Sequence, residues 1–569
     1  MADNKTKTDI KFHDKDYSSP ISGGDFRLRE LTLHSRSNDS IIHLNAAGVF
    51  VSLDIYEDLF SKVLRGTFTF VDNQGLAETV PIIGDEDLVI SYGTPGSEGT
   101  GTDFQKKRDL SSEDKSEEVI RQKFKVYDCI ENPLTEEGSA KVYKLFFVSW
   151  EYVISTKIKI SKGYKSRFYH QVVKDSLKKI NTKIDPEYRK NFFIEKTATP
   201  QNTIIPNWTP LEAIDFCASR STSAVEEESD QDEPNQNQLP FAPGSLFVYY
   251  EKLGTGFFYE SIESMIIKQK GKGSIPLYQY APKTTERADT NLALQYFGVD
   301  KFEIKSSFKT LENLGLGMYG STLIAYDPIR MKYDEVKYDY YEKEENPVIE
   351  TTDNQTGATT IETDLTQAKD DSQRIFADFI ATDIHPTERT QNKLISENSD
   401  YLGSNDASIK LATTTKAHDA MFVAPMLFPP TFDLTNTSIG VNAKTFKDNE
   451  AKPNKVENWL LQRQAQLQEF GNIIVNFTVA GNSSRHVGDL IRFEVPTAIA
   501  PNPPIFVPDV GHQLYSGYYL VSKIHHKITP TAYSTDFELI KNSFAKRIPG
   551  QTTKISTDGL PSTTSSGSS

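Results

Sequence analysis

The stretch from Ile473 to Phe544 decides the fold of this chain, and it contains four short runs: IIVNFTVAG (473–481), HVGDLIRFEVP (486–496), SGYYLVSKIHHKI (516–528) and STDFELIKNSF (534–544). Apolar and polar residues alternate within each run, and Gly, Pro, Asn and Ser separate the runs. This pattern is typical of antiparallel strands joined by turns. Strict alternation in the third run predicts one face made of Tyr518, Leu520, Ile524 and Ile528, and an opposite face made of Tyr519, Val521, Lys523 and Lys527.

An earlier stretch repeats this order of runs: GTFTFVDNQG (66–75), GDEDLVISY (84–92), KFKVYDCIEN (123–132) and KVYKLFFVSWE (141–151). When Ile130 is aligned with Ile524, Leu145 falls on Leu539 without a gap between the last two runs. The same alignment places Phe124 on Tyr518 and Val126 on Leu520. The identity is low, but the order predicts two copies of one small β domain, far apart in the sequence.

Two such domains bracketing a mixed region, with GDLIRFEVP (488–496), SGYYLVSKIHHKI (516–528) and FELIKNSF (537–544) in the last copy, resemble the baseplate hub proteins of contractile-tailed bacteriophages. The resemblance covers about half of the chain and depends on the order of the runs rather than on any signature residue. It implies a β-rich α+β fold, with two similar antiparallel tube-type domains and with helical and mixed inserts.

Composition agrees with a large β-rich protein. The chain has 569 residues, enough for about three to four domains. Tyr and Phe number 26 and 33, which favours sheets. The net charge of −15 argues against a nucleic-acid grip or an anionic-membrane anchor as the main activity, although a diffuse acidic surface is also ordinary for a soluble protein.

The cysteines and the termini predict a soluble protein that is not exported. Cys129 and Cys217 are expected to be buried free thiols, which fits a reducing compartment. The polar start of the chain lacks the apolar core of a signal peptide. The best apolar stretch, AMFVAPMLFPP (420–430), is short and broken by proline.

Shifts in composition predict eight segments. They are a flexible arm (1–24), a first β tube-type domain (25–158) with a loop insertion (93–118), a helical connector (159–224), a disordered acidic loop (225–240), a mixed β region (241–344), a linker and insertion region (345–453), a helix plus second β tube-type domain (454–547) and a disordered tail (548–569).

Helical spacing is seen between the two β domains. Tyr169, Val172, Val173, Leu177 and Ile180 recur at helical intervals over 166–180. A second helix is predicted after Thr209, which is a natural N-cap, with Pro210 in the first helical position and Glu212 completing a capping box.

Two further helices and one hairpin are predicted later in the chain. A helix over 454–471 would place Val456, Trp459, Leu460 and Leu467 on one side and stop at Gly471, and a shorter one would use Ala368, Ile375, Phe376 and Phe379. The GTG turn at 254–256 predicts a β-hairpin.

A search for chemistry finds no complete motif. The sequence lacks HExxH, GxSxG, GxxxxGK[ST] and GxGxxG. The acidic SDQDEPNQN (229–237) contains Pro234 and lacks the central glycine of a calcium loop. His525 and His526 are adjacent, so in a strand they point to opposite faces and cannot readily share a metal. Trp150 and Trp459 are interpreted as core anchors. We therefore predict no catalytic residue, no cofactor and no metal site.

The resemblance implies a structural role. The chain would form a trimeric ring that joins the tail tube to the central spike and forms the DNA-exit channel. Its partners would be two further copies of itself, the tail-spike protein, tube or tube-initiator proteins and inner baseplate wedge proteins. DNA would pass only in transit, no stable membrane binding is expected, and the protein would be located in the virion baseplate after assembly in the host cytoplasm.

Two alternatives stay open. One is the hub or spike-base of a related contractile injection or secretion system. The other, of a different class, is a cell-wall-degrading tail enzyme.

The charge also predicts the channel wall. Ring closure would remove the unpaired edges of small β domains. A conduit should not hold DNA, because each phosphate contact to Lys or Arg adds affinity. The wall is therefore expected to be neutral or acidic, with Lys523 and Lys527 offset by Glu494, Asp536 and Glu538.

Overall fold

The structure of the protein is a computed structural model. The structure describes residues 23–35, 40–44, 49–73, 75, 82–94, 120–133, 141–197, 200–223, 246–271, 275–281, 292–307, 309–317, 320–327, 332–339, 348–352, 359–363, 420–425, 460–495, 515–541, 553–555 and 561–563. The predicted arm (1–24), the loop insertion (93–118), the acidic loop (225–240) and the short helix near Phe376 lie wholly or mostly outside these residues.

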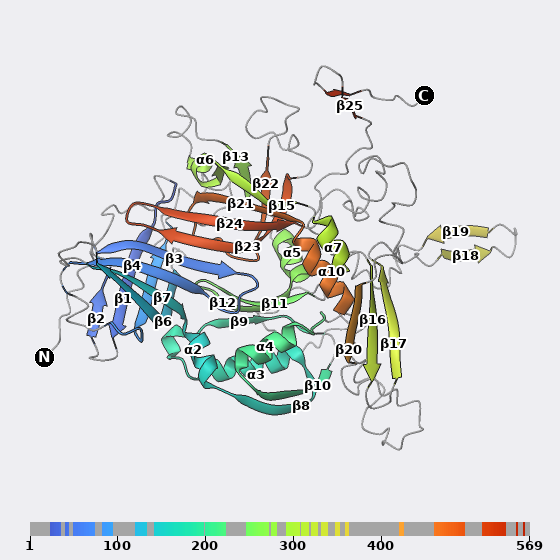
Figure 1. Ribbon diagram of the computed structural model, residues 1–569, viewed down its shortest axis with the longest axis horizontal. Helices are drawn as coiled ribbons and strands as arrows, with labels where there is room; N and C mark the ends of the chain where they lie inside the picture. The colour runs from blue at the N-terminus through green and yellow to red at the C-terminus, as the bar shows by residue number, and fades with distance from the viewer. Residues whose placement is uncertain are drawn as a thin grey trace, which may run out of the picture.

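A 14-stranded sheet built from both ends of the chain dominates the molecule (Figure 1). From the N-terminal part come β1 (Arg27–Ser35), β2 (Ser40–His43), β3 (Phe50–Asp58), β4 (Arg65–Asp72), β5 (Asp87–Gly93), β6 (Ile120–Pro133) and β7 (Lys141–Ser149). From the middle and the C-terminal part come β13 (Leu277–Tyr280), β14 (Gly298–Val299), β15 (Phe302–Ser307), β21 (Ile473–Ala480), β22 (Leu490–Glu494), β23 (Gly517–Ile528) and β24 (Tyr533–Lys541).

The sheet contains the same antiparallel unit twice. The first copy has the order β3-β4-β7-β6-β5, and the second has the order β15-β21-β24-β23-β22. The runs KFKVYDCIEN and GYYLVSKIHH occupy the same place in their units, in β6 and β23. The predicted β-rich α+β fold with two similar antiparallel domains is confirmed.

Fine detail is repeated as well. A register shift opposite β7 makes Tyr127 the extra residue in β6, and a shift opposite β24 makes Ser522 the extra residue in β23. Just before each bulge the backbone repeats one bond: Val126 N donates to Glu86 O at 2.9 Å, and Val521 N donates to Asp489 O at 2.9 Å. The two β domains therefore share their strand order, the position of the bulge and the backbone hydrogen bond that precedes it.

The bulges correct two residue-level predictions. With Tyr127 on Ser522, Val126 corresponds to Val521 rather than to Leu520, and Leu539 corresponds to Phe147 rather than to Leu145. The gapless alignment was therefore wrong by one residue in β6 and by two in β7, because the connecting loops differ in length.

The predicted faces of β23 were also wrong before the bulge. Tyr519 and Val521, both buried, share a face with Ile524 and Ile528, whereas Tyr518 lies on the face of Lys523 and Lys527. An extra residue inverts the alternation, since each residue normally changes face.

The helical connector packs beside the first domain (Figure 1). Its elements are α2 (Trp150–Lys157), β8 (Ile160–Phe168), α3 (Tyr169–Asn181), the short helix η2 (Pro186–Tyr188), β9 (Asn191–Ile194), β10 (Pro200–Trp208) and α4 (Pro210–Ala218). The apolar residues predicted for α3 are all buried. The capping box of α4 is confirmed: Thr209 Oγ1 accepts from Glu212 N at 3.3 Å, and Glu212 Oε2 accepts from Thr209 N at 2.7 Å.

The remaining elements are β11 (Phe247–Lys252), β12 (Gly256–Ser261), α5 (Ile262–Gly271), α6 (Leu292–Phe297), α7 (Thr310–Gly315), β16 (Gly320–Asp327), β17 (Lys332–Asp339), β18 (Val348–Thr352), β19 (Thr359–Thr363), β20 (Ala420–Pro425), α10 (Leu460–Phe470), β25 (Thr553–Ile555) and β26 (Pro561–Thr563). The β11–β12 hairpin confirms the predicted GTG turn. Strands β18, β19 and β20 lie in the stretch expected to be linker, and β25 and β26 lie in the expected tail.

Helix α10 confirms the predicted stop at Gly471 but buries a different side. Leu461 and Ala465 are buried, whereas Leu460 and Leu467 are half-buried. Val456 and Trp459 lie outside the described residues.

Three apolar cores hold these parts together. One fills the second domain, one fills the first, and one lies under α3 and α4. Ile528 and Tyr533 come from the second domain but pack in the core of the first. The two β domains therefore share core as well as sheet.

Candidate functional site: the seam between the two β domains

Strand β23 joins the two β domains edge to edge. Its first half pairs with β22 of its own domain, from Gly517 opposite Phe493 to Leu520 opposite Leu490. Its second half pairs along the same edge with β3 of the other domain, from Lys523 opposite Asp58 to Ile528 opposite Leu53. Figure 1 shows the orange-red strands continuing into the blue ones. We call this β23–β3 contact the seam.

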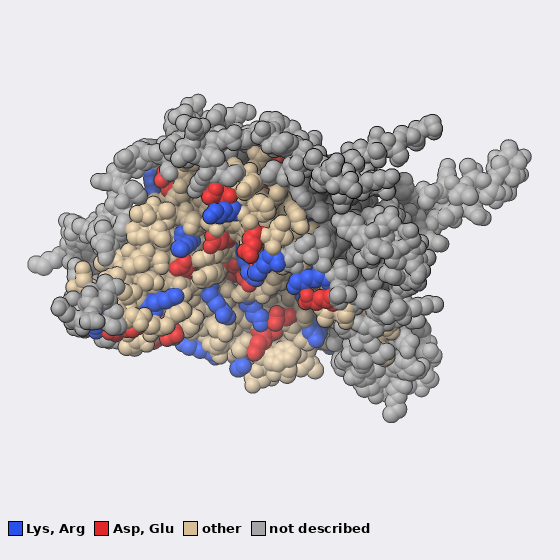
Figure 2. All heavy atoms as spheres, turned by 45° about the horizontal axis from the view of Figure 1, so that its top comes forward, with Lys and Arg blue, Asp and Glu red and all other residues tan. Residues whose placement is uncertain are grey.

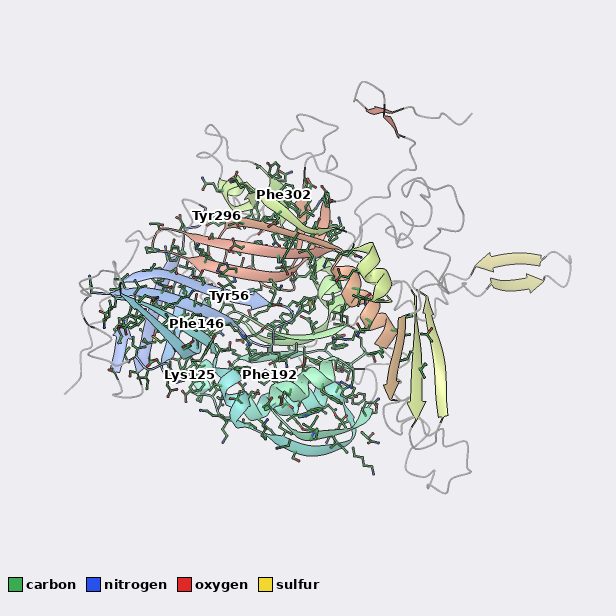
Figure 3. All side chains as sticks on the ribbon, viewed as in Figure 1. Tyr56, Lys125, Phe146, Phe192, Tyr296 and Phe302 are labelled. Atoms are coloured by element: carbon green, nitrogen blue, oxygen red, sulfur yellow. The ribbon has the colours of Figure 1, made fainter. Side chains whose placement is uncertain are left out.

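On the polar face of the seam, His525 is held between carboxylates of the two domains. Its Nε2 lies 2.9 Å from Asp54 Oδ1 on β3, and its Nδ1 lies 3.0 Å from Asp536 Oδ2 on β24. The imidazole also stacks on Tyr56, with ring centroids 4.5 Å apart and an interplanar angle of 15°. Figure 3 places Tyr56 where the strands of the two domains meet.

This arrangement favours a charged imidazole. Burial alone would lower the pKa of His525, but hydrogen bonds to Asp536 and Asp54 outweigh it and raise the pKa to about 9. Burial would raise the pKa of Asp54, yet its bond from His525 leaves that pKa below its ordinary value. At neutral pH the seam therefore carries an imidazolium between two carboxylates.

The rest of the polar face is balanced in charge. Lys523 Nζ lies 2.9 Å from Glu538 Oε1, and Lys305 Nζ lies 3.0 Å from Glu538 Oε2. The hydrogen bond from His525 lowers the pKa of Asp536, and attraction to Lys527 adds to this effect. Figure 2 shows blue and red groups interspersed over the surface in view.

We predicted that nearby acids would balance the charges of Lys523 and Lys527, and this is confirmed for Asp536 and Glu538. It was wrong for Glu494, which lies 2.7 Å from Arg492 instead. Glu494 is on β22, and the seam begins beyond the end of the β22 pairing, so this carboxylate is on a different part of the sheet.

Behind the seam, on the opposite face, Glu57 is fully buried and accepts four hydrogen bonds. His486 Nδ1 lies 3.1 Å from its Oε1 and His526 Nε2 lies 3.2 Å from the same oxygen. The backbone N–H groups of Val487 and Leu253 donate to it at 3.3 Å each. The other nitrogen of His526 lies 2.7 Å from the Tyr533 hydroxyl.

Glu57 therefore links three separate parts of the chain. It belongs to β3 of the first domain, the two histidines belong to the second domain, and Leu253 belongs to the turn of the β11–β12 hairpin. Burial by itself would raise the pKa of Glu57, but attraction to His486 and the hydrogen bonds from both histidines hold it well below its ordinary value. A buried carboxylate with this many donors is a structural joint.

A second buried acid, Glu251, links the helical connector to the first β domain through hydrogen bonds. Glu251 on β11 accepts from Leu64 N at 3.1 Å and from Ser149 Oγ at 2.6 Å. Gln122 Nε2 donates at 2.8 Å, and the Lys190 ammonium bonds to the same carboxylate. Lys190 also pairs with the buried Glu151 at 2.8 Å.

Sequence reasoning missed Glu57 and Glu251. A signal existed for Glu57, since in FVSLDIYED it continues the inward alternation of Leu53 and Ile55. An acid in an inward position of a strand indicates a buried partner elsewhere. What that partner is depends on the tertiary structure.

The histidine pair behaves as its spacing predicts. His525 points to the polar face and His526 points into the core, so each has its own partners. In the described part of the chain, no group of three or more His, Cys, Asp or Glu side chains is arranged to hold a metal ion. No described helix is long and apolar enough to cross a membrane.

Both cysteines are free, Cys217 is buried and Cys129 is half-buried. Burial raises the pKa of Cys217 well above its ordinary range and raises that of Cys129 to about 11. Both thiols are therefore protonated at neutral pH and poor as nucleophiles.

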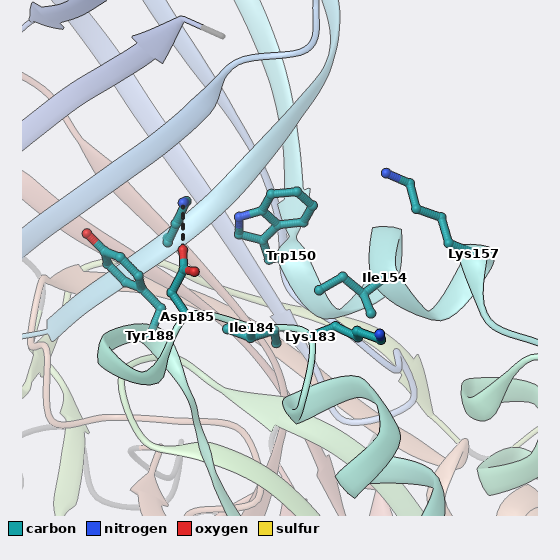
Figure 4. A pocket seen from close by; sticks show the side chains of 8 residues that line it. Trp150, Ile154, Lys157, Lys183, Ile184, Asp185 and Tyr188 are labelled. Atoms are coloured by element: carbon teal, nitrogen blue, oxygen red, sulfur yellow. Dashed lines mark ion pairs between the residues drawn. The ribbon is translucent and has the colours of Figure 1, made fainter. Parts of the chain in front are cut away.

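One pocket of about 260 Å³ lies between β6, α2 and η2 (Figure 4). Trp150, predicted as a core anchor, is half-buried in its wall, and Lys123 and Asp185 form an ion pair of 3.7 Å beside it. The pocket is lined by Lys123, Trp150, Ile154, Lys157, Lys183, Ile184, Asp185 and Tyr188.

Replacing His525 by Phe should make the seam less sensitive to alkali. The ring would still stack on Tyr56, but both N–H donors would be lost. The raised pKa means that the stabilisation is complete below the ordinary histidine value near 6.5 and is lost as the pH rises through about 9. We expect the variant to lose about 1–2 kcal/mol of unfolding free energy at pH 7, after solvent screening, and nearly nothing at pH 10. Urea unfolding at the two pH values measures this, and an equal loss at both would contradict it.

Replacing Glu57 by Ala should be more damaging. His526 and two backbone N–H groups would be left buried without their acceptor, which typically costs about 3–5 kcal/mol. The matched control is Asp215→Ala, which removes an exposed carboxylate 3.0 Å from Lys62 and should cost about 0–1 kcal/mol. Thermal and urea unfolding of both variants give the comparison, and equal losses would show that Glu57 is no joint.

Comparisons with known proteins find similar folds among tail proteins. No protein-family model matches the sequence, and no curated protein matches it. A tail protein from Neisseria meningitidis MC58 has a TM-score of 0.40 at 8% identity, over 90% of this chain and 96% of that chain. The 43 kDa tail protein of prophage MuSo2 from Shewanella oneidensis has a TM-score of 0.39 at 8% identity, over 91% and 100%. An E. coli type VI secretion component, described as structurally similar to the T4 tail proteins gp27 and gp5, has a TM-score of 0.34 at 8% identity, over 91% and 80%. Likenesses of this size do not by themselves assign a role to the chain.

Proposed function

We propose that the chain is the structural hub of a contractile phage tail, a trimeric ring that joins the tail tube to the central spike. One observation carries the proposal: two β domains of the same strand order are joined edge to edge into a single sheet at the seam. A chain built in this way is a preformed third of a ring of six similar units.

The geometry supports ring closure by identical means. The seam uses one edge of the second domain and one edge of the first, and each domain also has the other edge. Repeating the contact between chains would satisfy the remaining edges without a new kind of interface. Three chains would present six near-equivalent units, which suits a three-fold spike on one side and a six-fold tube on the other.

The polar face of the sheet supports a conduit. Lys523, His525 and Lys305 are each held by carboxylates within 3.0 Å. A wall of paired charges has few free cations for phosphate, so duplex DNA could pass without being held. The net charge of −15 acts in the same direction.

The size of the assembled particle tests the proposal. We expect a species of three times the 64.0 kDa chain mass, alone or after co-expression with its spike protein. Mass photometry and light scattering measure this. A chain that stays monomeric with its spike present would contradict the hub assignment, and lysis of peptidoglycan by the pure protein would favour the alternative of a cell-wall-degrading enzyme.

The same trimer should not retain duplex DNA. At physiological salt we expect no shifted band in a mobility assay, because the cations of the polar face are already paired. Tight binding of duplex DNA, weakening steeply with added salt, would show that the conduit has an unpaired basic lining. A protein of comparable size with a known basic DNA-binding groove serves as the positive control.

A further inference from the structure

The internal seam identifies the edges through which neighbouring chains would meet. Strand β23 corresponds to β6, and β3 corresponds to β15, since each pair occupies the same place in the repeated order. We propose that the second half of β6 in one chain pairs, antiparallel, with β15 of the next chain, as β23 pairs with β3 inside each chain. This inference rests on the proposed ring and names the contact that closes it.

Only the first half of the β6 edge is paired with a neighbouring strand, as in β23 before its contact with β3. Its first half, Ile120–Lys125, pairs with β5, as the first half of β23 pairs with β22. The bond from Val126 N to Glu86 O ends this pairing in β6, as the bond from Val521 N to Asp489 O ends it in β23. Beyond that point β23 pairs with β3. Residues 128–133 of β6, in contrast, have no strand partner on the corresponding side within the described part of the chain.

Strand β15 offers the complementary edge. It pairs with β21 on one side, as β3 pairs with β4. On its other side β3 pairs with β23, whereas β15 has no strand partner on that side among the described residues. The other ends of the sheet, β2 and β14, are only 4 and 2 residues long and have no counterpart at the seam.

The surfaces of the two edges also fit a protein neighbour. Ile130 and Tyr127 of β6 are 43% and 54% exposed, which is unusual for large apolar side chains on an open strand edge. The charged groups of both edges already have partners within the chain: Glu131 lies 2.8 Å from Lys141 and Lys305 lies 3.0 Å from Glu538. The fit of the two edges therefore depends on the exposed apolar side chains of β6 and on the backbone groups of both strands.

The correspondence fixes a register. Lys527 opposite Asp54 in the seam translates into Asn132 opposite Glu303. His525 opposite Tyr56 translates into Ile130 opposite Ser306, because Lys305 is an extra residue where β15 pairs with β21. In each chain, β6 would pair with β15 of one neighbour, and β15 would pair with β6 of the other neighbour. This head-to-tail contact closes into a ring when its rotation allows, and the seam supplies that rotation.

Disulfide trapping tests the register. In a Cys129→Ser background, the double variant Asn132→Cys with Glu303→Cys places the new thiols on directly opposed residues, close enough for a disulfide. On mild oxidation we expect a non-reducing gel ladder that ends at a covalent trimer and returns to monomer on reduction. The matched control, Asn132→Cys with Lys301→Cys, offsets the thiols by two residues, to about 7–8 Å, and should stay monomeric.

The outcomes separate the inference from the proposed function. A trimer by mass photometry without cross-links, or with cross-links in the offset control, overturns this contact while the hub assignment stands. A monomer under all conditions, with the spike present, overturns both. Hydrogen exchange on the unmodified protein gives a second measurement that needs no variant. Assembly should protect amides in 127–132 and 302–305, and unchanged exchange in both segments would also overturn the contact.

Discussion

The arrangement of this protein depends on the need of strand edges for hydrogen-bond partners. Strand β23 is 12 residues long, and its own domain covers only the first half of one edge. The uncovered half pairs with β3, where the contact from His525 to Asp54 spans 471 positions of the chain. Because of this one pairing, two small sheets become one sheet, and Ile528 and Tyr533 enter the core of the other domain. An edge left open at this length would otherwise invite pairing with other molecules.

Buried acids secure the joints that the backbone creates. Glu57 and Glu251 are both fully buried, and each collects donors from segments that are distant in sequence. A lone carboxylate in such a place would be strongly destabilising. With its donors present the carboxylate favours the arrangement seen here, because those donors come from separate segments that this arrangement brings together.

The two adjacent histidines of the seam lie on opposite faces of the sheet and have different partners. His526 points inward and completes the bonding of Glu57, whereas His525 points outward between Asp54 and Asp536. The inner residue belongs to the core, and the outer one belongs to a surface where cations and carboxylates alternate. The sheet therefore has one face that packs in the cores and one face on which cations and carboxylates are paired.

The parts of the fold that depend on local pattern could be predicted from the residues alone. The alternation in 473–544 predicted the strands, the order of runs predicted the duplication, and Thr209, Pro210 and Glu212 predicted the start of α4, because these signals act over a few residues. Long-range contacts set the remaining features, which are the faces of β23, the pairing of β23 with β3 and the partners of Glu57 and Glu251. A bulge at Ser522 changes the face of every residue on one side of it, yet no residue type in SKIHH marks it. The pairing and the buried bonds join residues hundreds of positions apart, and such contacts are selected by the packing of the whole chain.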